Sequence, residues 1–294
     1  MRRGYLDLAD GQVHLRECGE GETLVLLLHQ TAASSVMFER FATELTAGPL
    51  GSTHRFVALD TPGFGMSYRP AAPYNLADWA RVVGQAADAL GATSFHLLGH
   101  HTGAAIAMLL AAAAPERVAS LAMIGPLVLS VGERAEWEAS VTGLVVDEAG
   151  SQLGTVWQQV ATIDGDPLAY PPDLALRQRE TVDKLAAGER WHEAYLTVFR
   201  TDLGAALAST TCPAVLFSGV ADVLHPFAAA TLAARDGIEF HELAAGAYLL
   251  DQQPALVAEP YARFLERVPR ISRDGGPRRS ASFQPLPGGL HADS

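Results

Sequence analysis

The chain has 294 residues, 49% of them hydrophobic, which is enough for one large domain with an insertion or for two small domains. Its formal net charge of −12 argues against nucleic acid and anionic membranes as partners, because phosphate contacts need clustered lysines and arginines. The two cysteines, Cys18 and Cys212, form no CxxC pair, which indicates reduced thiols rather than a disulfide framework.

The first predicted element is a β-hairpin over residues 4–18, where two alternating runs flank Asp10-Gly11, a dipeptide typical of tight turns. A weaker alternating run near the other end of the chain, residues 238–243, indicates an edge strand. Between them lie five nearly continuous apolar runs, which are typical of parallel strands covered by helices on both faces. These runs are residues 23–29, 56–60, 95–99, 118–125 and 213–219.

Helical patterns alternate with these strands and cover residues 35–45, 76–90, 102–114 and 254–268. The third of them stops before Pro115, where the missing N–H group ends a helix. Strands and helices that alternate in this way predict an α/β fold with a doubly wound, mostly parallel sheet.

The alternation breaks between about residues 126 and 210, where only helical patterns occur and three of the four tryptophans lie. We expect residues 127–200 to form a helical cap over the C-terminal edge of the sheet, the edge where open α/β folds bind ligands. Residues 1–126 and 201–268 are then the core. Residues 269–294, rich in Pro, Gly, Ser and Arg, are expected to be disordered.

Residues 95–105 read FHLLGHHTGAA, which is a short strand, a Gly-His-His-Thr-Gly turn and the start of an alanine-rich helix. A Gly-x-nucleophile-x-Gly turn between a strand and a helix presents its middle residue from a sharply bent backbone. That middle residue is usually serine, but here it is His101.

With this turn, the chain resembles the α/β-hydrolase superfamily over roughly residues 4–268, in the capped branch of esterases, epoxide hydrolases and C–C hydrolases. The resemblance implies a Ser–His–acid triad and an oxyanion hole. The other segments that carry it are LVLLLHQTAASS, FVALDTPGFGMSYRP, CPAVLFSGVADVLHP and AAGAYLLDQQP.

The triad that the resemblance implies is incomplete in this chain. Asp222 matches the position of the acid, but His101 stands at the nucleophile position and Ala247 at the position of the catalytic histidine. A serine mechanism is therefore excluded, because neither the hydroxyl nor the imidazole beside it is present. The backbone N–H groups of Thr31 and Thr102 match the two donors of the oxyanion hole.

The two replacements suggest a compensation between them. The imidazole missing at Ala247 leaves a gap into which the longer His101 side chain can lean, and we predict a direct His101–Asp222 dyad. A general base held in this way accelerates a reaction about 10²- to 10⁴-fold. The other candidates for the lining of the pocket are Gln30, Trp157, Trp191, His225, Ala247 and Tyr248.

We expect no metal and no cofactor. His100 and His101 are adjacent on a sharp turn, so their side chains should diverge, and no spaced second pair of ligands exists. His100 is expected to have a structural role. Asp60 matches a position that is usually structural in the family, where it ties down a loop.

Three functions stay open. The first is a hydrolase that acts on a small, mostly apolar ester or carbonyl compound, with His101 as general base or nucleophile. The second is a non-hydrolytic lyase, decarboxylase, isomerase or cyclase on the same fold. The third is a catalytically inactive relative that only binds its ligand. Fold alone does not decide among them.

We expect no secretory signal, because no apolar stretch follows the basic residues of the N-terminal segment MRRGYLDLADG. Its longest alanine-rich apolar run, residues 103–114, is too short to span a bilayer. We expect a cytoplasmic protein with a small-molecule substrate and no nucleic-acid or membrane partner. A homodimer stays open.

Overall fold

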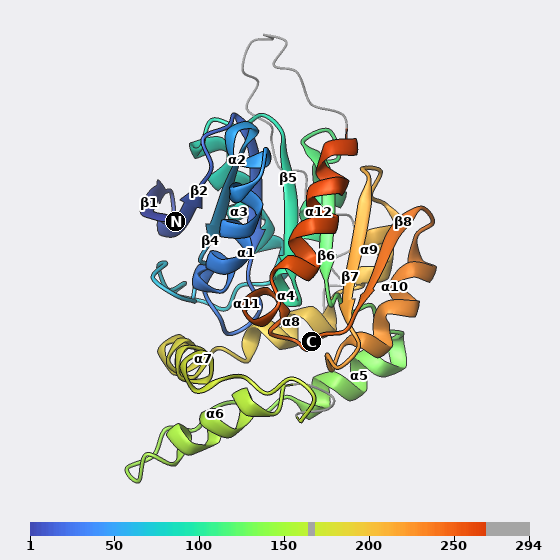
Figure 1. Ribbon diagram of the computed structural model, residues 1–294. Coiled ribbons are helices and arrows are strands. Elements are labelled where there is room, and N and C mark those ends of the chain that lie inside the picture. Colours follow the sequence, from blue (N-terminus) through green and yellow to red (C-terminus); the bar gives the residue numbers. More distant parts are fainter. Residues whose placement is uncertain (164–167, 269–294) are drawn as a thin grey trace.

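A computed structural model describes residues 1–163 and 168–268. Eight strands form one sheet in the order β1-β2-β4-β3-β5-β6-β7-β8, with helices against both of its faces (Figure 1). This confirms the predicted α/β fold. The predicted disorder of residues 269–294 lies outside the described residues.

Every predicted strand is present, with small shifts at the ends. The first two strands form the expected antiparallel hairpin, β2 also pairs antiparallel with β4, and the remaining pairs are parallel, with β8 at the edge. The strands are β1 Arg2–Leu8, β2 Gly11–Cys18, β3 Thr23–Leu28, β4 His54–Leu59, β5 Phe95–His100, β6 Val118–Ile124, β7 Ala214–Gly219 and β8 Ile238–Leu243.

The central strands are mostly apolar because both of their faces are covered. In β3, Leu24, Leu26 and Leu28 belong to one hydrophobic core, whereas Val25 and Leu27, which alternate with them, belong to the other. Successive side chains of a strand point to opposite faces, so a strand with two covered faces needs apolar residues at every position.

The helices divide between these two cores. The core that contains Leu24 includes residues of α3 Leu76–Ala89, α4 Thr102–Ala113, α9 Leu203–Ala208 and α10 Ala228–Ala234. The other core includes residues of α1 Glu39–Ala47, α2 Leu50–Thr53, α11 Leu249–Gln252 and α12 Ala255–Arg267. The helix predicted over residues 35–45 begins as a 3₁₀ turn, η1 Ser35–Phe38, and a second 3₁₀ turn, η2 His225–Phe227, precedes α10.

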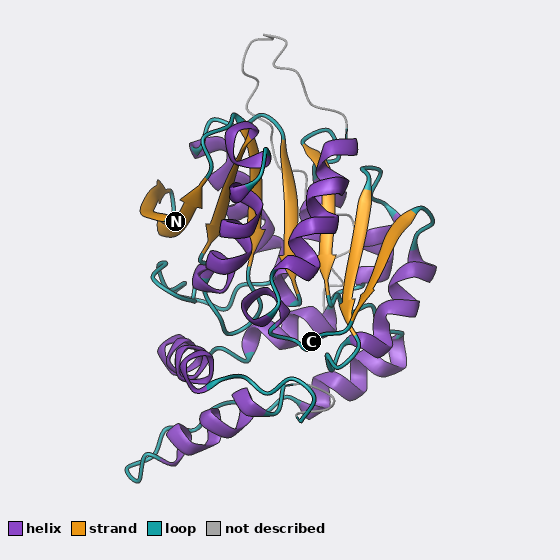
Figure 2. Ribbon diagram, in the orientation of Figure 1, coloured by secondary structure: helices purple, strands orange, loops and turns teal. Residues whose placement is uncertain are grey.

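The described part of the segment between β6 and α9 is helical, as its sequence pattern predicted, and four helices lie within those described residues. They are α5 Val131–Ser140, α6 Ser151–Ala161, α7 Leu174–Ala187 and α8 Glu193–Arg200. They lie beyond the ends toward which the parallel strands point (Figure 2). The exact division into core and cap stays a prediction. No helix in the described part of the chain is long and apolar enough to cross a membrane.

Candidate active site

The Gly-His-His-Thr-Gly turn joins β5 to α4 and places His101 between them, with φ 49° and ψ −110°. This backbone conformation is unfavourable for any residue with a Cβ atom, and it is the only positive φ of a non-glycine residue in the described ranges. The turn needs its two glycines because a Cβ atom on Gly99 would lie 2.2 Å from the carbonyl oxygen of Gly103. A Cβ atom on Gly103 would lie 2.0 Å from that of Leu28.

His101 and Asp222 are in direct contact. The ring nitrogen Nε2 of His101 lies 2.7 Å from the carboxylate oxygen Oδ2 of Asp222, a hydrogen-bonding distance. The predicted contact is therefore present, although the two residues are 121 positions apart in the chain. The histidine is partly exposed, while the carboxylate is buried, at 2% exposure.

The loop after β7 holds Asp222 in place. Its second carboxylate oxygen, Oδ1, accepts a hydrogen bond from the backbone N–H of Leu224 at 2.8 Å. Burial alone raises the pKa of Asp222, but His101 and the Leu224 N–H together outweigh burial and leave the pKa below its usual value. Asp222 is thus a buried, ionised partner for the imidazole at neutral pH.

Gly125, directly after β6, leaves the space for this contact. Its φ is +51°, and a Cβ atom on it would lie 2.7 Å from Nε2 of His101 and 2.9 Å from Oδ2 of Asp222. The contact therefore passes over the end of β6, the strand between those that carry the two residues. Sequence reasoning missed Gly125. The available signal was a glycine that ends the strand between the two candidate residues.

An apolar cavity of about 300 Å³ opens beside His101. His101 and Thr102 are part of its lining, and residues of the helical segment form much of the rest. Four aromatic side chains take part, namely Trp137, Trp191, Tyr195 and Phe199. The turn at residues 99–103, called the elbow below, thus meets the carboxylate of Asp222 and the cavity at the C-terminal edge of the sheet.

A family model described as alpha/beta hydrolase fold matches residues 23–193. The chain belongs to the α/β-hydrolase fold family. The 2-hydroxy-6-oxononadienedioate/2-hydroxy-6-oxononatrienedioate hydrolase of Klebsiella pneumoniae is 31% identical over 127 residues, which are 41% of this chain and 43% of that enzyme. This alignment therefore spans less than half of the relative's length.

Two further comparisons cover nearly the whole fold. RutD of Variovorax paradoxus, whose name refers to carbamate hydrolysis, is 28% identical over 269 residues, which are 88% of this chain and 96% of that protein. The crystal structure of the enol-lactonase from Burkholderia xenovorans LB400 has a TM-score of 0.73 at 17% identity, and covers 90% of this chain and 100% of that one. At this identity the structural likeness shows the fold alone.

The two oxyanion-hole donors that the family implies, Thr31 and Thr102, differ in their surroundings. Thr102 is the first residue of α4 and lines the cavity, and the first N–H groups of a helix have no partner within it. Thr31 is buried, and its carbonyl oxygen accepts a hydrogen bond from the hydroxyl of Tyr195 at 3.0 Å. In the described part of the chain, neither Thr31 nor Thr102 donates a hydrogen bond through its backbone N–H.

Of the six predicted pocket residues, only Trp191 lines the cavity beside His101. Trp157 lies instead under the guanidinium of Arg177, whose Cζ is 4.1 Å from the centre of the indole ring. His225 and Asp222 both line another cavity. The Nδ1 atom of His225 lies 2.9 Å from Oγ of Ser218.

The other three predicted pocket residues are buried beside the fold's core. The hydroxyl of Tyr248 donates to the carbonyl oxygen of Val160 at 3.1 Å, and Gln30 and Ala247 are buried outside the lining of the His101 cavity. The structure therefore does not bring Gln30, Ala247 and Tyr248 to the cavity beside His101, because position in the chain does not determine which way a side chain points. The aromatic residues Trp137, Tyr195 and Phe199 were missed for the same reason.

The two adjacent histidines do not diverge, contrary to the expectation. The ring centroids of His100 and His101 are 4.3 Å apart and the ring planes are tilted by 52°. His100 is fully buried, and among the described residues neither of its ring nitrogens has a hydrogen-bond partner. Burial, together with the neighbouring His101, holds the pKa of His100 well below its usual value, so the ring is neutral.

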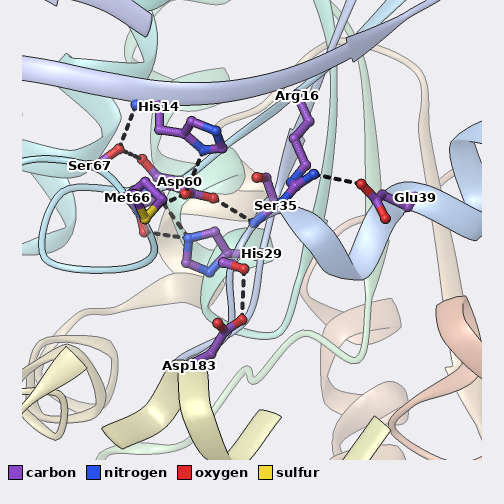
Figure 3. A network of polar contacts seen from close by, with 11 residues as sticks. His14, Arg16, His29, Ser35, Glu39, Asp60, Met66, Ser67 and Asp183 are labelled. Carbon is purple, nitrogen blue, oxygen red and sulfur yellow. Dashed lines mark hydrogen bonds and ion pairs between the residues drawn. The ribbon is translucent and has the colours of Figure 1, made fainter. Parts of the chain in front are cut away.

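A second buried network surrounds Asp60, which follows β4 (Figure 3). Asp60 accepts backbone N–H bonds from Ser35 at 2.6 Å and Met66 at 2.8 Å, and its Oδ2 lies 2.8 Å from Nδ1 of His14. Asp60 thus ties down the loop that follows β4. Nearby, Ser34 donates to the carboxylate of Asp183 on α7 at 2.7 Å, which connects the body to the helical segment.

Proposed function

We propose that this protein is a hydrolase of a small, mostly apolar ester or carbonyl compound, with His101 as its general base and Asp222 as the residue that orients it. The observation that carries the proposal is the 2.7 Å contact between the two side chains beside an apolar cavity. The hydrolase names of the relatives from Klebsiella pneumoniae and Variovorax paradoxus support the reaction class.

The contact determines which ring nitrogen of His101 is available. An ionised carboxylate only accepts hydrogen bonds, so the proton between the two groups belongs to Nε2 and the lone pair to Nδ1. Nδ1 is next to the ring carbon that carries the Cβ atom, and this crowding hinders its attack on a carbonyl carbon. Proton abstraction from water is therefore favoured over formation of an acyl-imidazole.

In the proposed reaction, a water molecule attacks the carbonyl carbon while Nδ1 of His101 takes its proton. The oxygen that becomes negative is stabilised by the backbone N–H groups of Thr31 and Thr102, each worth about 3 kcal/mol in comparable sites. The tetrahedral intermediate then collapses, and the imidazolium returns the proton to the leaving oxygen. An ester thus yields an acid and an alcohol, and Asp222 stays ionised throughout.

The lining of the cavity favours an uncharged substrate. Its described residues include four aromatic side chains but no Lys, Arg, Asp or Glu. A carboxylate transferred from water into such a site loses its hydration without gaining a partner. The Klebsiella relative is named for dioate substrates, and this chain is proposed to prefer neutral ones.

Turnover of short-chain p-nitrophenyl esters tests the proposal. The His101→Ala and Asp222→Asn variants should each lower kcat/KM by about 10²- to 10⁴-fold, whereas His192→Ala, which removes a partly exposed histidine outside the lining of the cavity, should not. Circular dichroism of each variant confirms that the fold is retained.

Each alternative gives a distinct result in the same experiment. Undiminished activity in His101→Ala contradicts the proposal. An acyl-enzyme trapped by acid quench and detected by mass spectrometry assigns His101 as the nucleophile instead. If the wild type binds neutral apolar ligands without turning over any ester, a non-hydrolytic or a purely binding function is favoured.

A further inference from the structure

His100 has an unusual environment for a histidine. It is fully buried, and neither Nδ1 nor Nε2 has a hydrogen-bond partner in the described part of the chain. Buried polar atoms are normally hydrogen-bonded, so an imidazole with two unpartnered nitrogens calls for a physical explanation. The mechanism proposed above does not use this side chain.

The unpartnered imidazole is close to two other groups that bind metals. One nitrogen of His100, one nitrogen of His101 and one carboxylate oxygen of Asp222 all lie within 4.8 Å of one another. His100 ends β5, His101 follows it in the turn, and Asp222 lies in the loop after β7. Two of its three members are buried, and the third, His101, lines the cavity.

We propose that His100, His101 and Asp222 bind one divalent transition-metal ion, with Zn²⁺ as the representative. Two imidazoles and one carboxylate form a donor set typical of zinc and non-haem iron sites that keep a coordination position open. The open position would be filled by water from the cavity that His101 lines. Mg²⁺ and Ca²⁺ are disfavoured because they prefer oxygen ligands, and Asp222 is the one residue of the three that supplies oxygen.

Small movements bring the cluster to coordination geometry. Metal–ligand bonds of about 2.0 to 2.1 Å place the donor atoms about 3 to 3.5 Å from one another. The Nε2 atom of His101 and the Oδ2 atom of Asp222, now 2.7 Å apart, need only a slight separation. The nitrogen of His100 must approach them, and no hydrogen bond within the described residues holds it back.

Metal binding and base catalysis exclude each other at this site. The ion takes the Nε2 atom of His101 and the carboxylate of Asp222, the two groups whose hydrogen bond orients the base. Bound zinc is therefore expected to inhibit ester hydrolysis, and a chelator should restore it. This consequence rests on the proposed function, whereas metal binding itself does not.

The test is a titration of the full chain, stripped of metals, with Co²⁺ and then with Zn²⁺. We expect one Co²⁺ per chain, with visible absorption of a low-coordinate nitrogen and oxygen site, and its displacement by Zn²⁺ in calorimetry. Loss of one ligand, in His100→Phe, His100→Ala or Asp222→Asn, should weaken Zn²⁺ binding at least about 100-fold. His100→Phe retains the bulk of the buried ring, and His192→Ala is the control that should bind as the wild type does.

Absence of saturable Co²⁺ or Zn²⁺ binding by the wild type overturns the inference, as does unchanged binding in a folded His100 variant. Failure of the proposed function looks different. If His101→Ala retains esterase activity but loses Zn²⁺, then the dyad mechanism is wrong and the metal site stands.

Discussion

A Cβ atom on Gly125 would lie 2.6 Å from Cδ2 of His101. The missing side chain at the end of β6 thus defines the space through which the imidazole reaches the carboxylate. The sequence hypothesis attributed this space to Ala247, where the family's catalytic histidine is replaced. In the structure, Gly125 at the end of the neighbouring strand leaves the space beside this contact.

Gly125→Ala should therefore displace the His101 ring and lower ester hydrolysis toward the level of His101→Ala. It should also cost about 1 to 2 kcal/mol of stability, because φ is +51° at this position. Gly237→Ala is a matched control, since φ is +76° there and no atom lies within 4 Å of the added Cβ. Kinetics and urea denaturation of both variants separate the two effects. Full activity in Gly125→Ala would contradict the packing argument.

A conventional triad should be obtainable by two substitutions. His101→Ser combined with Ala247→His restores the residue types that the family places around an acid such as Asp222. A fluorophosphonate probe should label this double variant at least about 100-fold faster than either single variant, because the hydroxyl needs the imidazole. The wild type should not react. If the wild type is labelled, another residue is the nucleophile.

The helical segment is held to the body by an ion pair between Arg179 of α7 and Asp251 of α11. The guanidinium donates to both carboxylate oxygens, at 2.6 and 2.7 Å, and Asp251 is buried. Asp251→Asn should lower the free energy of unfolding by about 2 kcal/mol. Arg267→Met, which removes an exposed ion pair with Glu239, should cost less than about 1 kcal/mol. Equal losses in chemical denaturation would show that burial of the pair is immaterial.

His96 should make the protein less stable in acid. Burial and, to a lesser degree, the nearby His54 lower the pKa of His96 to about 4. Between pH 4 and about 6.5 the unfolded chain binds a proton that the folded chain excludes, so stability falls as pH falls through this range. At pH 5, His96 lowers the free energy of unfolding by roughly 2 kcal/mol relative to neutral pH. His96→Gln should lose less stability than the wild type between pH 7 and pH 5 in urea denaturation, and equal losses would rule the effect out.

The sheet was predictable because its signal is local. Nearly continuous apolar runs such as 23–29 are typical of strands with both faces covered, and this pattern alone assigns the central strands. The helix α10 was missed because its seven residues, Ala228–Ala234, are too few to show a period. The helices between β6 and α9 were expected as helices, but their relative positions were not predictable.

Within the site, the contact between His101 and Asp222 was predictable because both follow parallel strands that end at one edge. Contacts that depend on the rotation of a helix about its axis were not predictable from the sequence. Trp157 and Trp191 appear equivalent in the sequence, yet one packs on Arg177 and the other lines the cavity. The approach of the His100 and His101 rings likewise depends on side-chain torsions, which the turn motif leaves undetermined.

The positive φ angle of His101 has a consequence for the stability of the folded chain. Only glycine adopts φ 49° with ψ −110° without strain. His101→Gly would therefore remove backbone strain from the turn and raise the free energy of unfolding. Histidine at position 101 thus costs stability that glycine would not. The imidazole is retained at a position where it destabilises the fold.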